Sequence, residues 1–526
     1  MDFGVSYPSR RVPLLAANVV ATSQPLAAQA GLSMLASGGN AIDAALAAAI
    51  TLSVVEPTGN GIGSDAFAIV WDGAELHGLN ASGRSPASWT PERFAGATEM
   101  PQRGWESVTV PGAVSAWVAL SERFGALPFE ALFAPALNYA QNGFAVSPTI
   151  AALWQAGGRT LSGQPGFAAH FLPEGRAPRA GERFVNPDLA RTLEAIASTK
   201  GLAFYEGELA EAIAEDAARH GAALTREDLA AHRCDWCGTI STAFHGVDLH
   251  EIPPNGQGIA ALIALGLLRG TDIADHAPDS VEAMHLQIEA VKLALADAER
   301  YVADPAAMEV GPGALLDDAY LAERARLIGA EAGDPGAGAP RDGGTVYLSA
   351  ADAEGRMVSF IQSNYAGFGS GVVVPRTGIH LQNRGAGFDL APDHPNVVGP
   401  SKRPFHTIIP GFVMRDGRPE MSFGVMGGPM QAQGHVQMVV RTALHGQNPQ
   451  AASDAPRWRV VACRKVAVEW GMPTEIVEGL AARGHEITRE APDNAFGFGG
   501  AQLVMRGEAG YVAGSDHRKD GCAVGF

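Results

Sequence analysis

The spacing of hydrophobic residues near the start of the chain is that of helices. Residues 22–57 predict two of them: Ser23 and Pro25 begin the first, Gly38-Gly39 end it, and Asn40 caps the second. The second helix is apolar on nearly every side. We therefore expect it to be buried between layers of structure.

Further along, the spacing changes from helical to strand-like. Residues 105–330 are mostly helical in pattern, whereas the part after residue 344 alternates as half-buried strands do and is joined by Gly and Asn/Asp turns. Strands are expected at 345–351, 356–362, 371–375, 408–413 and 421–426, with a helix from about Gln431. The boundary between the two patterns lies near residue 344.

The segment 333–344 forms this boundary and consists mainly of Gly, Pro and Ala, which cannot build a packed element. It runs directly into Thr345, which opens a strand. A threonine hydroxyl attacks poorly without a nearby base. If the chain were cut between Gly344 and Thr345, the new α-amine, with a pKa of about 7.7–8, would be that base. Taken alone, the pattern also fits a threonine that merely begins a hairpin.

Gly427-Gly428 lies between an expected strand and an expected helix. Two successive backbone N–H groups at a helix N-terminus can form an oxyanion hole, and glycine lets a substrate carbonyl approach closely. A plain strand-to-helix turn fits the same residues. No Gly-x-Ser-x-Gly motif is present, which disfavours a Ser-His-Asp hydrolase.

Composition and charge exclude several classes of partner. The chain has 526 residues, of which 46% are hydrophobic, and a net charge of −18. This charge speaks against nucleic acid and anionic membranes as partners. No apolar segment follows the N-terminal arginines, and the longest apolar run, 44–55, is too short to span a membrane. A cytoplasmic protein is expected.

Four cysteines are too few for a disulfide framework in a chain of this length. Cys234 and Cys237 form a Cys-x-x-Cys motif, which can bind zinc or carry out redox chemistry. A zinc site needs a second pair of ligands at similar spacing, and Cys463 and Cys522 do not form one. We therefore expect no metal and no cofactor, with a metal or redox role for this motif as the alternative.

Several motifs in order resemble the γ-glutamyltransferase family of N-terminal-nucleophile hydrolases, and the likeness covers nearly the whole chain. The residues that carry it are Ala21-Thr-Ser-Gln-Pro-Leu-Ala, Gly38-Gly-Asn-Ala-Ile-Asp-Ala-Ala, Glu56-Pro, Val110-Pro-Gly-Ala, Pro253-Pro-Asn-Gly-Gln-Gly, Gly344-Thr345, Lys402-Arg-Pro, Gly427-Gly428 and Gly514-Ser-Asp-His-Arg-Lys-Asp-Gly.

The resemblance implies an α+β fold, a four-layer αββα sandwich, cut into a large subunit, 1–344, and a small subunit, 345–526, that stay together. It also implies that Thr345 attacks an amide carbonyl while the N–H groups of Gly427 and Gly428 hold the oxyanion. Ser363 stands where the family keeps a second threonine, which hydrogen-bonds the nucleophile's terminus. The partners implied are a small amide substrate and the second subunit, and a homo-oligomer is left open.

The chain departs from the family at positions that hold the substrate. Gly387, with Ala386 beside it, replaces the aspartate that grips an α-ammonium, and Ser82 replaces the arginine for the α-carboxylate, with Arg84 two residues on. Two further differences are Tyr365 in place of an asparagine, with Asn364 beside it, and His406-Thr407 in place of a serine pair. His406 is expected either to touch the acyl group or to bond the backbone.

Arg384 stands where the family has a neutral glutamine. A guanidinium in a pocket without the ammonium-binding aspartate suits an acid that lacks an α-amine. The expected substrate is therefore a small carboxylate-bearing amide, oxamate-like or glutaryl-type, unless Arg384 pairs with a carboxylate of the protein. Residues 388–402 are shorter than in members with a lid, which favours hydrolysis over transfer. The alternatives are a true γ-glutamyltransferase or glutathione hydrolase, and an inactive relative that acts as a binding protein.

Overall fold

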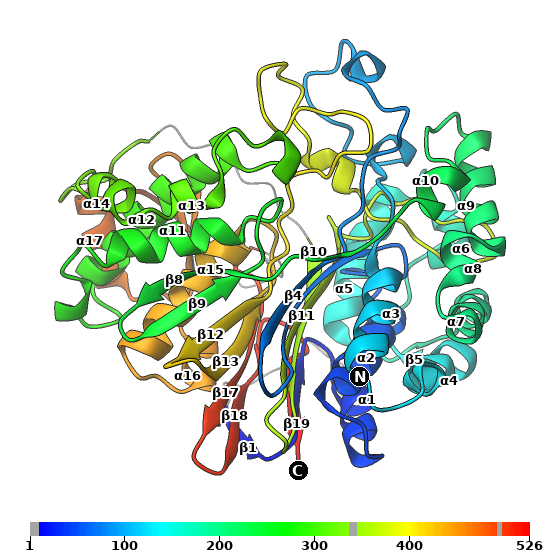
Figure 1. Cartoon of the computed structure of the whole chain (residues 1–526), viewed down its shortest axis with the longest axis horizontal. Helices are drawn as coiled ribbons and strands as arrows, with labels where there is room; N and C mark the ends of the chain where they lie inside the picture. The colour runs from blue at the N-terminus through cyan, green and yellow to red at the C-terminus, as the bar shows by residue number, and fades with distance from the viewer. Residues whose placement is uncertain (1–9, 336–343, 492–496) are drawn as a thin grey trace.

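The computed structural model describes residues 10–335, 344–491 and 497–526. Two seven-stranded sheets lie face to face in the centre of the molecule, and helices cover the outer face of each (Figure 1). This is the four-layer αββα sandwich that the resemblance implied. Of the segment 333–344, residues 336–343 lie outside the described part of the chain.

The first sheet has the order β19-β2-β10-β11-β3-β4-β7, and every neighbouring pair is antiparallel. It therefore combines strands from both sides of residue 344. Its strands are β2 Val19–Thr22, β3 Asp65–Trp71, β4 Leu76–Asn80, β7 Asp235–Trp236, β10 Gly344–Ala351, β11 Met357–Tyr365 and β19 Cys522–Gly525.

The second sheet has the order β1-β18-β17-β13-β12-β9-β8 and is also antiparallel throughout. Its strands are β1 Leu14–Ala16, β8 Ile240–Phe244, β9 Val247–Glu251, β12 Gly411–Arg415, β13 Arg418–Val425, β17 Ala501–Gly507 and β18 Gly510–Gly514. Two smaller sheets are β5 Phe144–Ala145 with β6 Arg183–Phe184, and β14 Trp458–Ala462 with β15 Lys465–Glu469 and β16 Glu486–Glu490.

Helices on the side of the first sheet come from the N-terminal half of the chain. They are α1 Pro25–Ala36, α2 Ala41–Val55, α3 Ala113–Phe124, α4 Ala134–Asn142, α5 Pro148–Leu161, α6 Phe167–Phe171, α7 Pro187–Thr199, α8 Leu202–Tyr205, α9 Glu208–Arg219 and α10 Arg226–Ala230. Every residue of α2 is buried, as expected for a helix between the sheet and the outer helices. Asn40 caps α2 in a capping box with Asp43.

Helices on the side of the second sheet come from both halves of the chain. They are α11 Gly258–Leu268, α12 Val281–Tyr301, α13 Pro312–Leu315, α14 Asp318–Ala325, α15 Met430–Val439, α16 Pro449–Asp454 and α17 Thr474–Ala482. A hydrophobic cluster fills the space between the two sheets and includes Phe67, Tyr347, Ile361 and Phe412. No helix of the described residues is long and apolar enough to cross a membrane.

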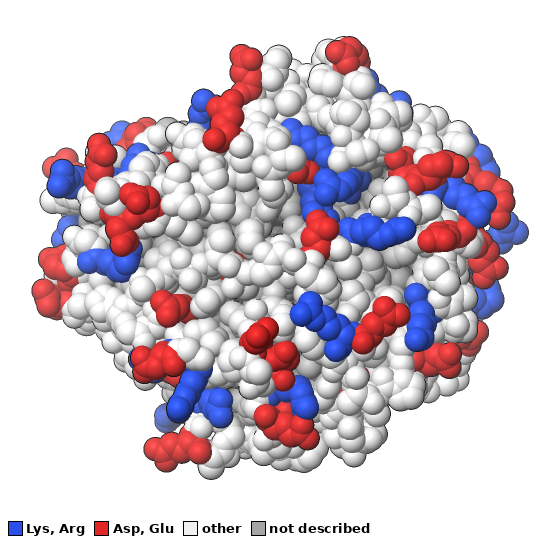
Figure 2. Space-filling model, viewed as in Figure 1, with Lys and Arg blue, Asp and Glu red and all other residues white. Residues whose placement is uncertain are grey.

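Two details of the expected secondary structure were wrong. The side chain of Gln24, not Ser23, caps α1, because the Ser23 hydroxyl donates to Glu56 instead. Residues 371–375 form an isolated bridge at Val373 rather than a strand. On the face shown in Figure 2, acidic and basic side chains are interspersed over the helical flanks.

Candidate active site

Thr345 lies at an irregularity between two central strands. Gly344 pairs with Tyr365 and Val346 with Gln362, so two residues of β11, Ser363 and Asn364, oppose Thr345 alone. Such a bulge turns side chains out of the regular alternation. The Ser363 hydroxyl lies 3.1 Å from Oγ1 of Thr345 and accepts a hydrogen bond from the backbone N–H of Tyr365.

Tyr365 follows the bulge with a φ of 77°, a left-handed conformation that non-glycine residues rarely adopt. Strain of this kind persists only where the surrounding structure fixes it, and it is common at functional sites. The bulge and the strained residue together place the Ser363 hydroxyl against the Thr345 hydroxyl.

A second polar group reaches Thr345 from α15, which lies on the side of the second sheet. The side-chain amide of Gln431, in the first turn of α15, donates to Oγ1 of Thr345 at 3.3 Å. Gln431 was expected to begin a helix but was not among the site residues predicted from the sequence. Thr345 itself is 1% exposed with the chain intact at Gly344.

The Gly427-Gly428 turn lies directly before α15. The two glycines have φ angles of 116° and 59°, which side chains rarely tolerate. The carbonyl oxygen of Gly428 accepts from the backbone N–H of Gln431 and from the side chain of Gln257, at 3.1 and 2.9 Å. Within the described residues, neither glycine N–H donates a hydrogen bond. Both remain able to bind an oxyanion.

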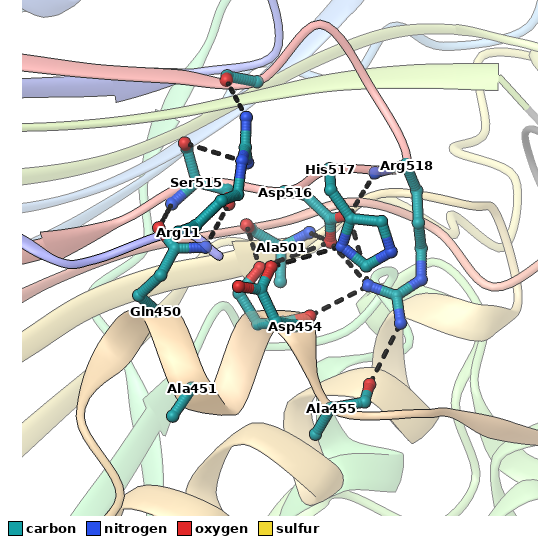
Figure 3. Close-up of polar contacts among 12 residues, drawn as sticks. Arg11, Gln450, Ala451, Asp454, Ala455, Ala501, Ser515, Asp516, His517 and Arg518 are labelled. Atoms are coloured by element: carbon teal, nitrogen blue, oxygen red, sulfur yellow. Dashed lines mark hydrogen bonds and ion pairs between the residues drawn. The ribbon is translucent and has the colours of Figure 1, made fainter. Parts of the chain in front are cut away.

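The C-terminal motif, residues 514–521, lies against the strand pair that leads into this turn, and Figure 3 shows the hydrogen bonds of its Asp516 and Arg518. Asp516 accepts hydrogen bonds from the backbone N–H of Ala501 at 2.6 Å and from Arg518. Ala501 pairs with Val425 at the end of β13, two residues before Gly427. The pKa of Asp516 is lowered despite burial, because Arg457 and Arg518 stabilise its charge. The motif thus holds the strand that carries the glycine turn.

A cavity of about 240 Å³ adjoins the turn. Its walls combine apolar side chains with polar and charged ones. The lining residues are Gln257, Leu295, Ala298, Glu299, Val302, Tyr365, Ala386, Gly387, Phe388, Asp389, His394, Asn396, Phe405, Thr407 and Pro429. The structure therefore brings Tyr365, Thr407 and the Ala386-Gly387 pair to one cavity beside the Gly427-Gly428 turn.

Arg384 lies behind the wall of this cavity and is 1% exposed. Its Nη1 donates to the Thr407 hydroxyl at 2.8 Å, and its guanidinium carbon is 4.7 Å from the centre of the Tyr365 ring. Burial lowers the pKa of Arg384 to about 10, partly offset by the charge of Asp65. Among the described residues, no carboxylate pairs with this guanidinium, and its Nε and Nη2 have no hydrogen-bond partner.

His406 does not line the cavity. Its Nε2 lies 3.1 Å from Oδ2 of Asp65, its Nδ1 accepts weakly from the backbone N–H of Ile408, and the ring is fully buried. Burial raises the pKa of Asp65 to about 7 and lowers that of His406 well below its usual value. Asp65 also accepts from the backbone N–H of Gly83 and Gly112. The pair therefore connects loops of the protein.

Three other positions from the sequence analysis also lie away from the cavity. Asn364 points to the opposite face of β11, where it accepts from the Ser64 hydroxyl. Arg84 forms an ion pair with Asp304 at 3.0 Å. Ser82 is fully buried and donates to Asn80.

The Cys-x-x-Cys motif straddles the short strand β7. Cys234 packs against the helix-side core of the first sheet, whereas Cys237 packs against the core between the sheets. The two thiols lie on opposite faces of the sheet edge, so they do not converge on a common ligand.

One buried cluster has donor atoms spaced for a metal ion. His285, Glu289 and His485 place one donor atom each within 4.8 Å of the others. The buried ammonium of Lys292 already binds Glu289 at 2.7 Å. This ammonium supplies the positive charge that the carboxylate would otherwise require.

The chain is similar to known proteins over nearly its whole length. The family model described as gamma-glutamyltranspeptidase matches residues 27–526. The chain is 36% identical over 519 residues to the "Glutathione hydrolase-like YwrD proenzyme" of Bacillus subtilis, covering 97% of this chain and 98% of that protein. It is 36% identical over 517 residues to the "Oxamate amidohydrolase proenzyme" of Klebsiella pneumoniae, covering 95% and 97%.

A solved structure is similar over the same extent. The cephalosporin acylase from Bacillus halodurans superposes with a TM-score of 0.96 at 47% sequence identity, covering 100% of this chain and 99% of that one. Several of these relatives are named as proenzymes, that is, as precursors of the active form. From its sequence match and its fold, the chain belongs to the gamma-glutamyltranspeptidase family and is an N-terminal-nucleophile amidohydrolase.

Proposed function

We propose that the chain cuts itself between Gly344 and Thr345, and that Thr345 then hydrolyses the amide bond of a small carboxylate-bearing substrate. The mature protein would consist of a large subunit, 1–344, and a small subunit, 345–526. The observation that carries this proposal is the arrangement around Oγ1 of Thr345, which Ser363 and Gln431 hydrogen-bond beside the Gly427-Gly428 turn.

Self-cleavage proceeds through an ester. Oγ1 of Thr345 attacks the carbonyl carbon of Gly344, the bond to the Thr345 nitrogen breaks, and the hydroxyl proton ends on that nitrogen. Water then hydrolyses the ester, which leaves the Gly344 carboxylate and a new α-amine on Thr345. In the intact chain Thr345 is almost completely buried and its nitrogen is part of a peptide bond, so cutting is what converts this nitrogen into a base.

Amide hydrolysis repeats the same chemistry on the substrate. The α-amine of Thr345 takes the hydroxyl proton, Oγ1 attacks the amide carbonyl, and the N–H groups of Gly427 and Gly428 hold the oxyanion. The amine leaves with the proton from the Thr345 amino group, and water releases the acyl group.

Arg384 supports a substrate with a carboxylate. A buried guanidinium with two unpartnered donor atoms is costly, and a carboxylate is the ligand that satisfies it best. Thr407 and Tyr365 touch the guanidinium and line the cavity. A substrate carboxylate would therefore reach Arg384 by displacing the Thr407 hydroxyl. A relative named for oxamate, a small carboxylate-bearing amide, supports this class.

We favour hydrolysis over acyl transfer because the segment 388–402 is shorter than in family members that carry a lid over the site. Phe388, Asp389, His394 and Asn396 of this segment form one wall of the cavity. A site without a long covering loop admits water to the acyl-enzyme.

A γ-glutamyl substrate is the second candidate, and one observation favours it. Asp389 lines the cavity two residues after Gly387, so a carboxylate is present near the position that grips an α-ammonium in the family. Several relatives are named glutathione hydrolase.

Two matched substrates separate the candidates. Glutaryl p-nitroanilide and γ-glutamyl p-nitroanilide differ only in the α-ammonium group. We expect a kcat/KM at least about 10-fold higher for the glutaryl compound, because no aspartate stands at position 387 to offset the cost of desolvating the ammonium. A preference for the γ-glutamyl compound by the same factor would contradict the proposed substrate class.

A further inference from the structure

We infer that Gln431 is a catalytic residue, which donates a hydrogen bond to the attacking oxygen of Thr345 during both self-cleavage and substrate hydrolysis. The inference rests on the proposed function, since it assigns a role in the same reaction. It starts from the contact between Nε2 of Gln431 and Oγ1 of Thr345, at 3.3 Å.

The orientation of the Gln431 amide is fixed by a backbone group. Its Oε1 accepts from the N–H of Ile409 at 3.0 Å. A backbone N–H can only donate, so the oxygen of the amide must face Ile409 and the nitrogen must face Thr345. The side chain is fully buried, which leaves no water to exchange for either partner. Gln431 is therefore a dedicated donor to Oγ1.

The same residue also contacts the oxyanion turn. The backbone N–H of Gln431 donates to the carbonyl oxygen of Gly428 at 3.1 Å. One residue thus fixes the distance between the nucleophile and the amides that receive the developing negative charge. Small errors in this distance cost large factors in rate.

The donor constrains the direction of attack. Oγ1 of Thr345 has one proton and two lone pairs. Gln431 occupies one lone pair, so the hydroxyl proton has to point to a different acceptor, and the Ser363 oxygen lies 3.1 Å away. As the proton leaves, negative charge develops on Oγ1 opposite Nε2–H, which stabilises it.

The chain offers a matched control on the same helix. Gln433 is also buried in α15, and its amide binds the backbone N–H and carbonyl of Val460 at 2.7 and 3.2 Å. Gln431→Met and Gln433→Met each remove a buried glutamine of α15 with a similar volume. Only the first removes a contact with the nucleophile.

The test measures the rate of self-cleavage in purified protein and kcat/KM after cleavage. We expect Gln431→Met to slow both by about 10- to 100-fold relative to Gln433→Met, because a hydrogen bond to a charged group contributes about 1.5–3 kcal/mol. Equal rates for the two variants would overturn the inference. If Gln431→Met does not fold, as judged by its thermal unfolding, Gln431→Glu replaces it.

Gln431→Glu adds a readout that a purely structural role would not move. In this variant an ionised carboxylate can still accept from Ile409 but cannot donate to Oγ1, whereas the protonated carboxyl can do both. We expect the activity of Gln431→Glu, relative to the parent, to rise as the pH falls. A pH-independent ratio would overturn the inference. If the proposed function itself were wrong, Thr345→Ala would still be cut into two subunits. That result is distinct from any result for the Gln431 variants.

Discussion

Gly344 lies opposite Tyr365 in the pairing of β10 with β11, and the register shifts at the very next residue. The bond proposed to be cut therefore lies at the start of a central strand, next to a bulge that turns Ser363 toward Thr345. On one side of the bulge a strained tyrosine stacks on Arg384. Tyr365 thus contacts both sides of the site: it pairs with Gly344 at the bond proposed to be cut, and its ring lies against Arg384, the residue proposed to bind the substrate carboxylate.

Removing the Ser363 hydroxyl should slow the chemistry without unfolding the protein. We expect Ser363→Ala to lower the rate of self-cleavage and kcat/KM by about fivefold, since one hydrogen bond contributes about 1 kcal/mol. Ser363→Thr keeps the hydroxyl and should retain most of the activity. Equal losses in both variants would assign the effect to packing, against the proposed contact.

Arg384 is expected to act on substrates that carry a carboxylate. Arg384→Met should lower kcat/KM for glutaryl p-nitroanilide by about 10- to 100-fold, because a charge-assisted hydrogen bond contributes about 1.5–3 kcal/mol. For butyryl p-nitroanilide, which lacks that carboxylate, the parent and the variant should be within about twofold. A similar loss on both substrates would contradict carboxylate binding.

The glycine turn can be tested against a glycine of similar strain elsewhere. Gly427 has a φ of 116°, and Gly355, in the hairpin between β10 and β11, has a φ of 91° and open space where a methyl group would be added. Alanine at either position should cost about 1–3 kcal/mol of stability. Gly427→Ala should also abolish most of the activity, and Gly355→Ala should retain it. Retained activity in Gly427→Ala would argue against an oxyanion role.

The protein should lose stability in mild acid through buried histidines such as His485. Burial and the nearby charge of Lys292 lower its pKa to about 3, from an ordinary value of about 6.5. Between these values the unfolded chain binds a proton that the folded chain does not, so stability falls as the pH falls from about 6.5. Urea unfolding of His485→Asn should show a smaller slope with pH, by up to about 1.4 kcal/mol per unit. An unchanged slope would contradict this.

Local sequence patterns predicted the elements whose stability is local. The capping box of Asn40 and the apolar run that follows determine α2, and the alternation after Thr345 determines β10 and β11. The hairpin of β8 and β9 within the helical half was not expected, because it is held in the sheet only by the pairing of β9 with β12, which comes from residues far along the chain.

The sequence predicted the site residues that are neighbours along the chain. It predicted less well the contacts between residues that only the folded structure brings together. The sequence placed Gly427-Gly428 before a helix, and the structure shows that turn. The role of Gln431 could not be predicted from the sequence, because its partner Thr345 is distant along the chain and reaches it only in the folded structure. The burial of His406 against Asp65 likewise depends on a contact between distant segments.

The central claim is that Thr345 cuts the chain and then serves as the nucleophile. Intact-mass spectrometry of the purified parent and of Thr345→Ala tests it most directly, with amide hydrolysis measured on the same samples. The account predicts two fragments for the parent, the smaller beginning at Thr345, and for Thr345→Ala a single inactive chain of about 54.6 kDa. A Thr345→Ala protein that matures into the same two fragments and hydrolyses amides like the parent would contradict it.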